Sequence, residues 1–362
     1  MDAGGTDAGG ADAGGMVSVD AAWASFDPAT QQALLDQLAN GVVNNNLVGA
    51  AMGLASADGT LWAGASGLAN VETMQPWEPT RSFRIGSVTK TFTAALIFLL
   101  EADGALTLDD PLEQWVPGFY DGVGVTLRHL MSNTSGIVSY NYVGSFDSSA
   151  VWTPTALVQW AVDHEPALRF APGSQWEYSN TNWVLLGLVI EAAGADTYEA
   201  LVAQRLTLPL GLTHTYIAGA DDDNPAIVEC YAADRVTNMT QVANPSFGWA
   251  AGAAVSTPAD LARWAVALYG GAVLPESALT RMVTPTVLTN GTVTDYGMGA
   301  FLELDGEDAL YGHTGGYAAY FTYMYYWKRD RLALVVMSNT YDTNLRDLAA
   351  YGWSVPLGFM YP

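Results

Sequence analysis

The sequence is poor in cysteine, in metal-ligand patterns and in long apolar runs, and each shortage excludes a class of protein. A single cysteine, Cys230, in 362 residues rules out an intrachain disulfide framework. No two of the four histidines stand at metal-ligand spacing, so we expect no metal and no other cofactor. The apolar run that follows Thr93 is much shorter than the roughly 20 residues that cross a bilayer, so we expect no membrane span.

Basic residues are also scarce: 13 stand against 37 acidic ones, which gives a formal net charge of −24. Nucleic acids and anionic lipids need clustered Lys and Arg, so neither is an expected partner. The acidity suits a salty or extracellular habitat, or serves simple solubility. With 50% hydrophobic residues, the chain can bury a large core, and a small molecule is the expected partner.

Residues 1–15 repeat an Asp-Ala-Gly-Gly unit and lack the apolar block of a signal peptide. We therefore expect residues 1–27 to be a disordered acidic leader. This leader is either a solvated segment without a role or a tether that followed a removed export signal. The second reading places the protein outside the cell or in the periplasm.

The hydrophobic pattern predicts strands near both ends of the chain and helices between them. Asp27 before Pro28 is typical of a helix N-cap followed by proline in the first turn. The expected strands are 47–55, 61–69, 296–304, 317–326 and 332–338. The expected helices are 28–38, 86–103, 127–132, 154–162, 182–193, 198–206, 258–268 and 344–351.

This order of elements predicts an α/β (α+β) fold. We expect one antiparallel sheet, assembled from residues 28–85 and 290–362 and flanked by helices, with residues 86–289 inserted as a mainly helical subdomain. The interface between the two parts is a natural place for a cleft.

Ser87 and Lys90 stand three residues apart near the start of an expected helix, so the amine would lie beside the hydroxyl. A serine hydroxyl is too weakly acidic to attack a carbonyl unaided, and neutral lysine can accept its proton if burial lowers the lysine pKa. An acidic protein raises that pKa, so the site has to be dry. Trp176, Trp249 and Tyr317 are candidate walls of such a site.

The Ser-x-x-Lys pattern occurs by chance in many helices, but two further motifs accompany it here. A Tyr-Ser-Asn sequence occupies 178–180, and a His-Thr-Gly sequence occupies 313–315. In this order the motifs resemble those of the penicillin-recognising serine hydrolases, which comprise serine D,D-peptidases, class C β-lactamases, D-aminopeptidases and family VIII esterases. The resemblance covers roughly residues 28–355 and implies a β-lactamase/transpeptidase-like fold.

The resemblance implies a role for each motif residue. Ser87 would be the nucleophile that forms an acyl-enzyme, and Lys90 would accept its proton. Tyr178 would be the second acid/base, and a phenol near two cations could lose its proton near neutrality. Asn180 would orient Lys90 and hydrogen-bond the substrate.

The strand with the His-Thr-Gly sequence would form the edge of the cleft. The implied substrate-binding residues on it are His313, Thr314, Gly315 and Gly316, with Trp249 added as a wall. Gly315 would let a substrate backbone approach, and the Gly316 N–H would complete an oxyanion hole with the Ser87 N–H.

Two departures from the family pattern bear on the substrate. His313 replaces a lysine, so a permanent positive charge for a substrate carboxylate is missing. Carboxypeptidases of this branch place an arginine just after a Tyr-Gly-x-Gly-x strand, whereas residues 296–300 here lead into Phe-Leu-Glu. These departures favour small esters or D-amino-acid amides and peptides. A β-lactamase, a D,D-carboxypeptidase or other penicillin-binding protein, and a non-catalytic binding or self-assembling module stay open as alternatives, as does the oligomeric state.

Overall fold

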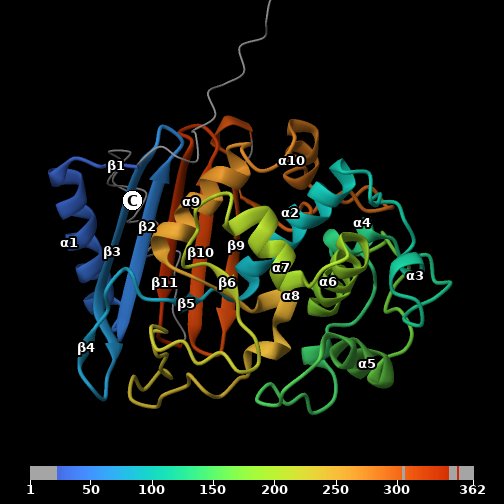
Figure 1. Cartoon of the computed structure of the whole chain (residues 1–362), viewed down its shortest axis with the longest axis horizontal. Helices are drawn as coiled ribbons and strands as arrows, with labels where there is room; N and C mark the ends of the chain where they lie inside the picture. Colours follow the sequence, from blue (N-terminus) through green and yellow to red (C-terminus); the bar gives the residue numbers. More distant parts are fainter. Residues whose placement is uncertain (1–22, 304–305, 342–348, 350–362) are drawn as a thin grey trace, which may run out of the picture.

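A large, mostly antiparallel sheet forms one side of the molecule in the computed structural model, which describes residues 23–303, 306–341 and 349 (Figure 1). Its strand order is β1-β3-β2-β11-β10-β9-β8, and β4 pairs with β3. The strands are β1 (Ala24–Ser25), β2 (Gly49–Ser56), β3 (Thr60–Asn70), β4 (Gln75–Pro76), β8 (Phe301–Glu303), β9 (Leu310–Tyr317), β10 (Tyr320–Trp327) and β11 (Leu332–Ser338).

The centre of the sheet joins the two ends of the chain. Strand β2 lies antiparallel to β11, with Met52 opposite Val336. The strands expected over 47–55 and 61–69 are present as β2 and β3, which pair antiparallel, and so is the expected last strand, β11. These pairings confirm a sheet assembled from both chain ends.

Three expectations for the sheet need correction. Within the strand expected over 296–304, only Phe301–Glu303 forms a strand, β8. The strand expected over 317–326 is interrupted near its start. A tight turn at Ala318, whose φ is +50°, separates Tyr317, the last residue of β9, from β10. Two alanines carry no turn signal in the sequence. Residues 24–25, expected within the leader, form β1 because the Ala24 N–H donates to Gly59 O (2.8 Å) and the strand pairs with β3.

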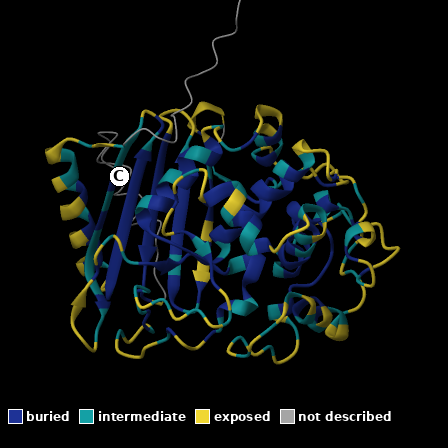
Figure 2. Cartoon of the chain, in the orientation of Figure 1, coloured by how far each residue is buried: buried dark blue, intermediate teal, exposed yellow. Residues whose placement is uncertain are grey.

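Helices pack on both faces of the sheet, and Figure 2 shows that its central strands are buried. Helix α1 (Pro28–Asn44) begins at Asp27, whose carboxylate accepts the N–H groups of Ala29 and Thr30, and it packs Leu34 and Leu38 on one face. Helix α9 (Pro258–Tyr269) packs on the other. Successive strand residues point to opposite faces, so the apolar residues of β2 pack against α1 on one face and against α9 on the other.

The other helices lie beyond α9, on the far side from α1 (Figure 1). They are α2 (Thr89–Ala102), α3 (Leu112–Trp115), α4 (Leu127–Met131), α5 (Pro154–His164), α6 (Asn180–Gly194), α7 (Tyr198–Val202), α8 (Trp249–Gly252) and α10 (Glu276–Met282). Seven of the expected helices are confirmed by α1, α2, α4, α5, α6, α7 and α9, although α1 is longer than expected and α7 is shorter. Among the described residues no helix is long and apolar enough to cross a membrane.

A second, small sheet lies next to the start of α2 and has no counterpart in the sequence-based expectations. Its strands β5 (Phe83–Arg84), β7 (Ala254–Ser256) and β6 (Tyr216–Ile217) are two or three residues long, too short to show a period in the sequence. Strand β5 leads directly into Ser87. Most of the leader and nearly all of the expected helix 344–351 lie outside the described residues.

Candidate active site

Ser87 lies in a 3₁₀ turn, η1 (Gly86–Val88), that leads into α2. The backbone at Gly86 has φ +54°, and a Cβ there would lie 2.7 Å from the backbone nitrogen of Gly316 on β9. Only glycine allows both this conformation and this approach. The turn thus places Ser87 at the edge of the large sheet.

Lys90, one turn further along, is fully buried, and its amine has three neighbours. Nζ lies 2.9 Å from Ser87 Oγ, 2.8 Å from Asn180 Oδ1 and 2.6 Å from Ala251 O. Burial lowers the lysine pKa well below 10.5. The expected dry site around the amine is therefore present.

The Tyr178 ring faces this amine, with its centroid 4.9 Å from Lys90 Nζ. Burial raises the pKa of Tyr178 above its usual value of 10.0, although a hydrogen bond with the Ser87 side chain opposes the shift. The expectation that this phenol loses its proton near neutrality is wrong, because burial of the ring disfavours the charged phenolate. Tyr178 is a protonated hydroxyl at neutral pH.

The outer edge of β9 runs past Ser87. Thr314 and Gly316 are exposed, whereas a Cβ on Gly315 would lie 1.9 Å from Ile85 O, so glycine is required there. Since Tyr317 pairs with Tyr320 across a two-residue turn, the Gly316 N–H points away from β10. The backbone nitrogen of Ser87 lies close to this edge, 3.3 Å from the position of a Cβ built on Gly315. Two main-chain amides are thus placed together beside the Ser87 hydroxyl, as an oxyanion hole requires.

His313 is buried behind this edge and carries no charge at neutral pH. Its Nδ1 lies 2.5 Å from Thr314 O, and its Nε2 lies 3.3 Å from the Tyr296 hydroxyl. Burial and then the proximity of Lys90 lower the pKa of His313 from 6.5 to about 3. The histidine therefore supplies no cation for a substrate.

The depressed pKa of His313 predicts an acid-sensitive contribution to stability. Between pH 6.5 and about 3 the unfolded state binds a proton at this histidine that the folded state does not, so the free energy of unfolding decreases as the pH falls through this window. His313→Gln removes that contribution. In urea unfolding at several pH values, the stability difference between wild type and variant is expected to change below pH 6.5; a constant difference would contradict the burial of a neutral histidine.

The three aromatic residues predicted to line the site lie in different places. Trp176 is half-buried, and its ring centroid lies 6.4 Å from that of Tyr178. Tyr317 is buried at the end of β9, where its hydroxyl donates to Ala243 O (2.8 Å). Trp249 does not join the site: its ring packs on Gly187 of α6, and its Nε1 donates to Glu199 Oε1 (2.8 Å). We correct its assignment to a core residue beneath the site.

Several groups that complete the site carry no signal in the sequence. Ala251 contributes a backbone carbonyl, which no side-chain motif reveals. Asn141, in the turn η2 (Tyr140–Tyr142), contacts the amide of Asn180 and carries no recognisable motif. Asn133 supports the Tyr178 segment, because its backbone and side-chain oxygens accept the N–H groups of Glu177 (3.0 Å) and Ser179 (3.3 Å).

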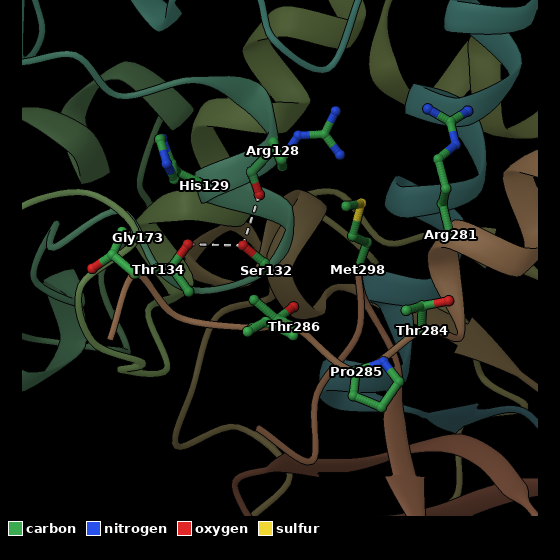
Figure 3. Close-up of a pocket in the computed structure, with 12 residues that line it drawn as sticks. Arg128, His129, Ser132, Thr134, Gly173, Arg281, Thr284, Pro285, Thr286 and Met298 are labelled. Atoms are coloured by element: carbon green, nitrogen blue, oxygen red, sulfur yellow. Dashed lines mark hydrogen bonds between the residues drawn. The ribbon is translucent and has the colours of Figure 1, made fainter. Parts of the chain in front are cut away.

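A separate pocket of about 410 Å³ lies beside α4 and α10 (Figure 3), and none of its lining residues belongs to the Ser87 group. Its two arginines are neutralised within the protein, Arg128 by Asp109 (2.8 Å) and Arg281 by Glu101 (2.5 Å). Arg84, three residues before Ser87 in the sequence, forms a buried ion pair with Asp222. Neither Arg84 nor Arg128 is therefore free to hold an anion.

Within residues 23–303 and 306–341 no group of three His, Cys, Asp or Glu side chains could hold a metal ion. The chemistry available to this site comes from a hydroxyl, a buried amine whose pKa is lowered, a phenol and two main-chain amides. These groups can activate an alcohol and stabilise an oxyanion.

Comparisons with known proteins agree with this geometry. The chain is 29% identical to penicillin-binding protein 4* of Bacillus subtilis over 75% of its own length and 64% of the relative. It is 31% identical to esterase EstB of Burkholderia gladioli over 58% and 57% of the two lengths. The chain thus spans less than two thirds of these curated relatives.

Solved structures match over most of both chains. D-amino acid amidase from Ochrobactrum anthropi SV3 superposes with a TM-score of 0.82 at 25% identity, over 91% of this chain and 99% of the other. D-stereospecific amidohydrolase from Streptomyces sp. gives a TM-score of 0.74 at 30% identity, over 92% and 99%. The family model described as Beta-lactamase matches residues 32–353. The chain belongs to the beta-lactamase family.

Proposed function

We propose that the protein is a serine hydrolase that forms an acyl-enzyme on Ser87 and acts on small esters or D-amino-acid amides and peptides. The observation that carries this proposal is the fully buried amine of Lys90, 2.9 Å from the Ser87 hydroxyl. A binding protein has no need for a desolvated lysine beside a serine. The names of the relatives, among them an esterase and two D-specific amide hydrolases, support the reaction class.

The contacts of Lys90 fix the direction of the proton transfer. A neutral amine has two N–H groups and one lone pair. Asn180 Oδ1 and Ala251 O can only accept, so they take both N–H groups. The lone pair is left for Ser87, whose hydroxyl donates to it, and Lys90 is thereby arranged as the general base.

The acylation step then follows from the arrangement. Ser87 Oγ bonds to the substrate carbonyl carbon while its proton passes to Lys90 Nζ. The carbonyl oxygen, now an oxyanion, accepts the N–H groups of Ser87 and Gly316. As the tetrahedral intermediate collapses, the bond to the leaving group breaks and the leaving group takes the proton of the Tyr178 hydroxyl. The protonated Lys90 then returns a proton to Tyr178. Water attacking the acyl-enzyme reverses these transfers.

The charges around the site select against anionic substrates. His313 is uncharged, and both arginines considered above are paired with acids. Moving a free carboxylate from water into a dry site costs desolvation free energy, and without a cation no interaction compensates that cost. Neutral esters and amides avoid that cost.

A substrate panel tests this proposal. We expect kcat/KM for p-nitrophenyl butyrate and D-alanine amide to exceed that for the carboxylate-bearing dipeptide D-alanyl-D-alanine by about 10-fold or more, which corresponds to about 1.4 kcal/mol. L-alanine amide is the stereochemical control. A preference for D-alanyl-D-alanine, or rapid labelling by fluorescent penicillin, would favour the carboxypeptidase or penicillin-binding alternative, which the match to penicillin-binding protein 4* supports.

A further inference from the structure

A chain of hydrogen bonds leads from Lys90 to a residue outside the family motifs. The Asn180 side chain lies between Lys90 and Asn141: its Oδ1 faces Nζ at 2.8 Å, and its Nδ2 donates to Asn141 Oδ1 at 3.0 Å. An amide has a donor end and an acceptor end, so the partner at one end decides which end faces the lysine.

Ser139 decides the orientation of Asn141 in turn. The Ser139 Oγ accepts the backbone N–H of Asn180 at 2.8 Å, where α6 begins. Its own O–H donates to Asn141 Oδ1 at 2.6 Å. Asn141 Oδ1 thus receives two donors, which leaves the Asn180 oxygen to face Lys90.

A flipped Asn180 amide would disable the base. Its NH₂ group would face Lys90 Nζ and compete for the lone pair that otherwise accepts the Ser87 proton. One N–H of the amine would also lose its acceptor. The orientation of a single amide therefore separates an active lysine from an inactive one.

We propose that Asn141, held by Ser139, is a positioning residue that locks the Asn180 amide with its oxygen toward Lys90 and so reserves the lysine lone pair for Ser87. This inference rests on the proposed function. Asn141 touches neither Ser87 nor Lys90 in any recorded hydrogen bond, so it acts through Asn180 alone.

Two substitutions of Asn141 separate positioning from a merely structural role. Asn141→Leu removes the acceptor, and we expect kcat for p-nitrophenyl butyrate to fall roughly 10- to 100-fold, the effect of a small misplacement in an active site, with little change in KM. Asn141→Asp keeps an obligate acceptor, so the plateau of kcat at high pH is retained. Its negative charge favours the charged lysine, so the acid limb of the pH profile of kcat/KM moves to higher pH.

Asn238→Leu is the matched control, because its side chain forms two hydrogen bonds that contact Glu229 and Thr240 and none that reaches the Ser87 group. We expect it to leave kcat and the acid limb unchanged. Equal loss of kcat in Asn141→Leu and Asn141→Asp, or an unchanged kcat in Asn141→Leu, would overturn the inference. If Ser87→Ala retains turnover in the same assay, the proposed function itself fails, and the two failures are thereby distinguished.

Discussion

Ser87→Ala is expected to lower kcat for p-nitrophenyl butyrate by at least about 10,000-fold, because the nucleophile and its base act as a unit. This decrease in kcat reflects a slower chemical step. Alanine removes one oxygen that is half-exposed at the edge of β9, so we expect the thermal midpoint of unfolding to stay close to that of the wild type. Steady-state kinetics and thermal unfolding of the same preparation measure both.

Ser149→Ala is the matched control for this substitution. Ser149 is an exposed serine whose hydroxyl donates to Asp147, and its loss leaves the reaction unaffected. Turnover by Ser87→Ala within 10-fold of wild type, a difference of about 1.4 kcal/mol in activation free energy, would mean that another group performs the reaction.

Lys90→Met is expected to reduce kcat/KM by about 1,000-fold or more, within the upper part of the range for losing a general base that also activates the nucleophile. Methionine fills a similar volume but accepts no proton, and it leaves Asn180 Oδ1 and Ala251 O without their donor. The wild-type kcat/KM rises with pH through the pKa of Lys90, because the base works only when neutral. Burial holds that pKa well below 10.5, and the variant is expected to lack this limb.

The chain offers a direct control for the lysine. Lys328, the only other lysine, lies at the end of β10 and pairs with Glu307 at 3.6 Å. Lys328→Met removes the same charge far from Ser87 and is expected to keep both the rate and the acid limb. An acid limb that persists in Lys90→Met would assign the titration to another group.

The contact between Ser87 and Lys90 could be predicted because helix geometry alone brings residues three apart together. The convergence of Tyr178 and the His313 strand on that pair could be expected only from the ordered motifs, since 90 or more residues separate them from Ser87. The direction of the Tyr178 pKa shift could not be predicted, because it depends on how the fold buries the ring and on its hydrogen bond with Ser87.

Groups that act through the backbone or through a neighbour left no pattern in the sequence. Ala251 serves through its carbonyl, and Asn141 is one asparagine among many until the fold places it against Asn180. Trp249 was wrongly assigned to the site, because the sequence alone does not tell whether an aromatic residue lines a cleft or lies in the core. The domain boundaries and a location outside the cell stay predictions.

Peptide mass spectrometry of the acylated protein tests the central claim most directly. The protein is mixed with p-nitrophenyl butyrate, quenched in acid within the first turnover and digested. The account predicts one added butyryl group, carried by the peptide that contains Ser87, and no such adduct on Lys90→Met over the same interval. A butyryl group on any other residue, or hydrolysis that proceeds at the wild-type rate with no adduct on Ser87, would contradict it.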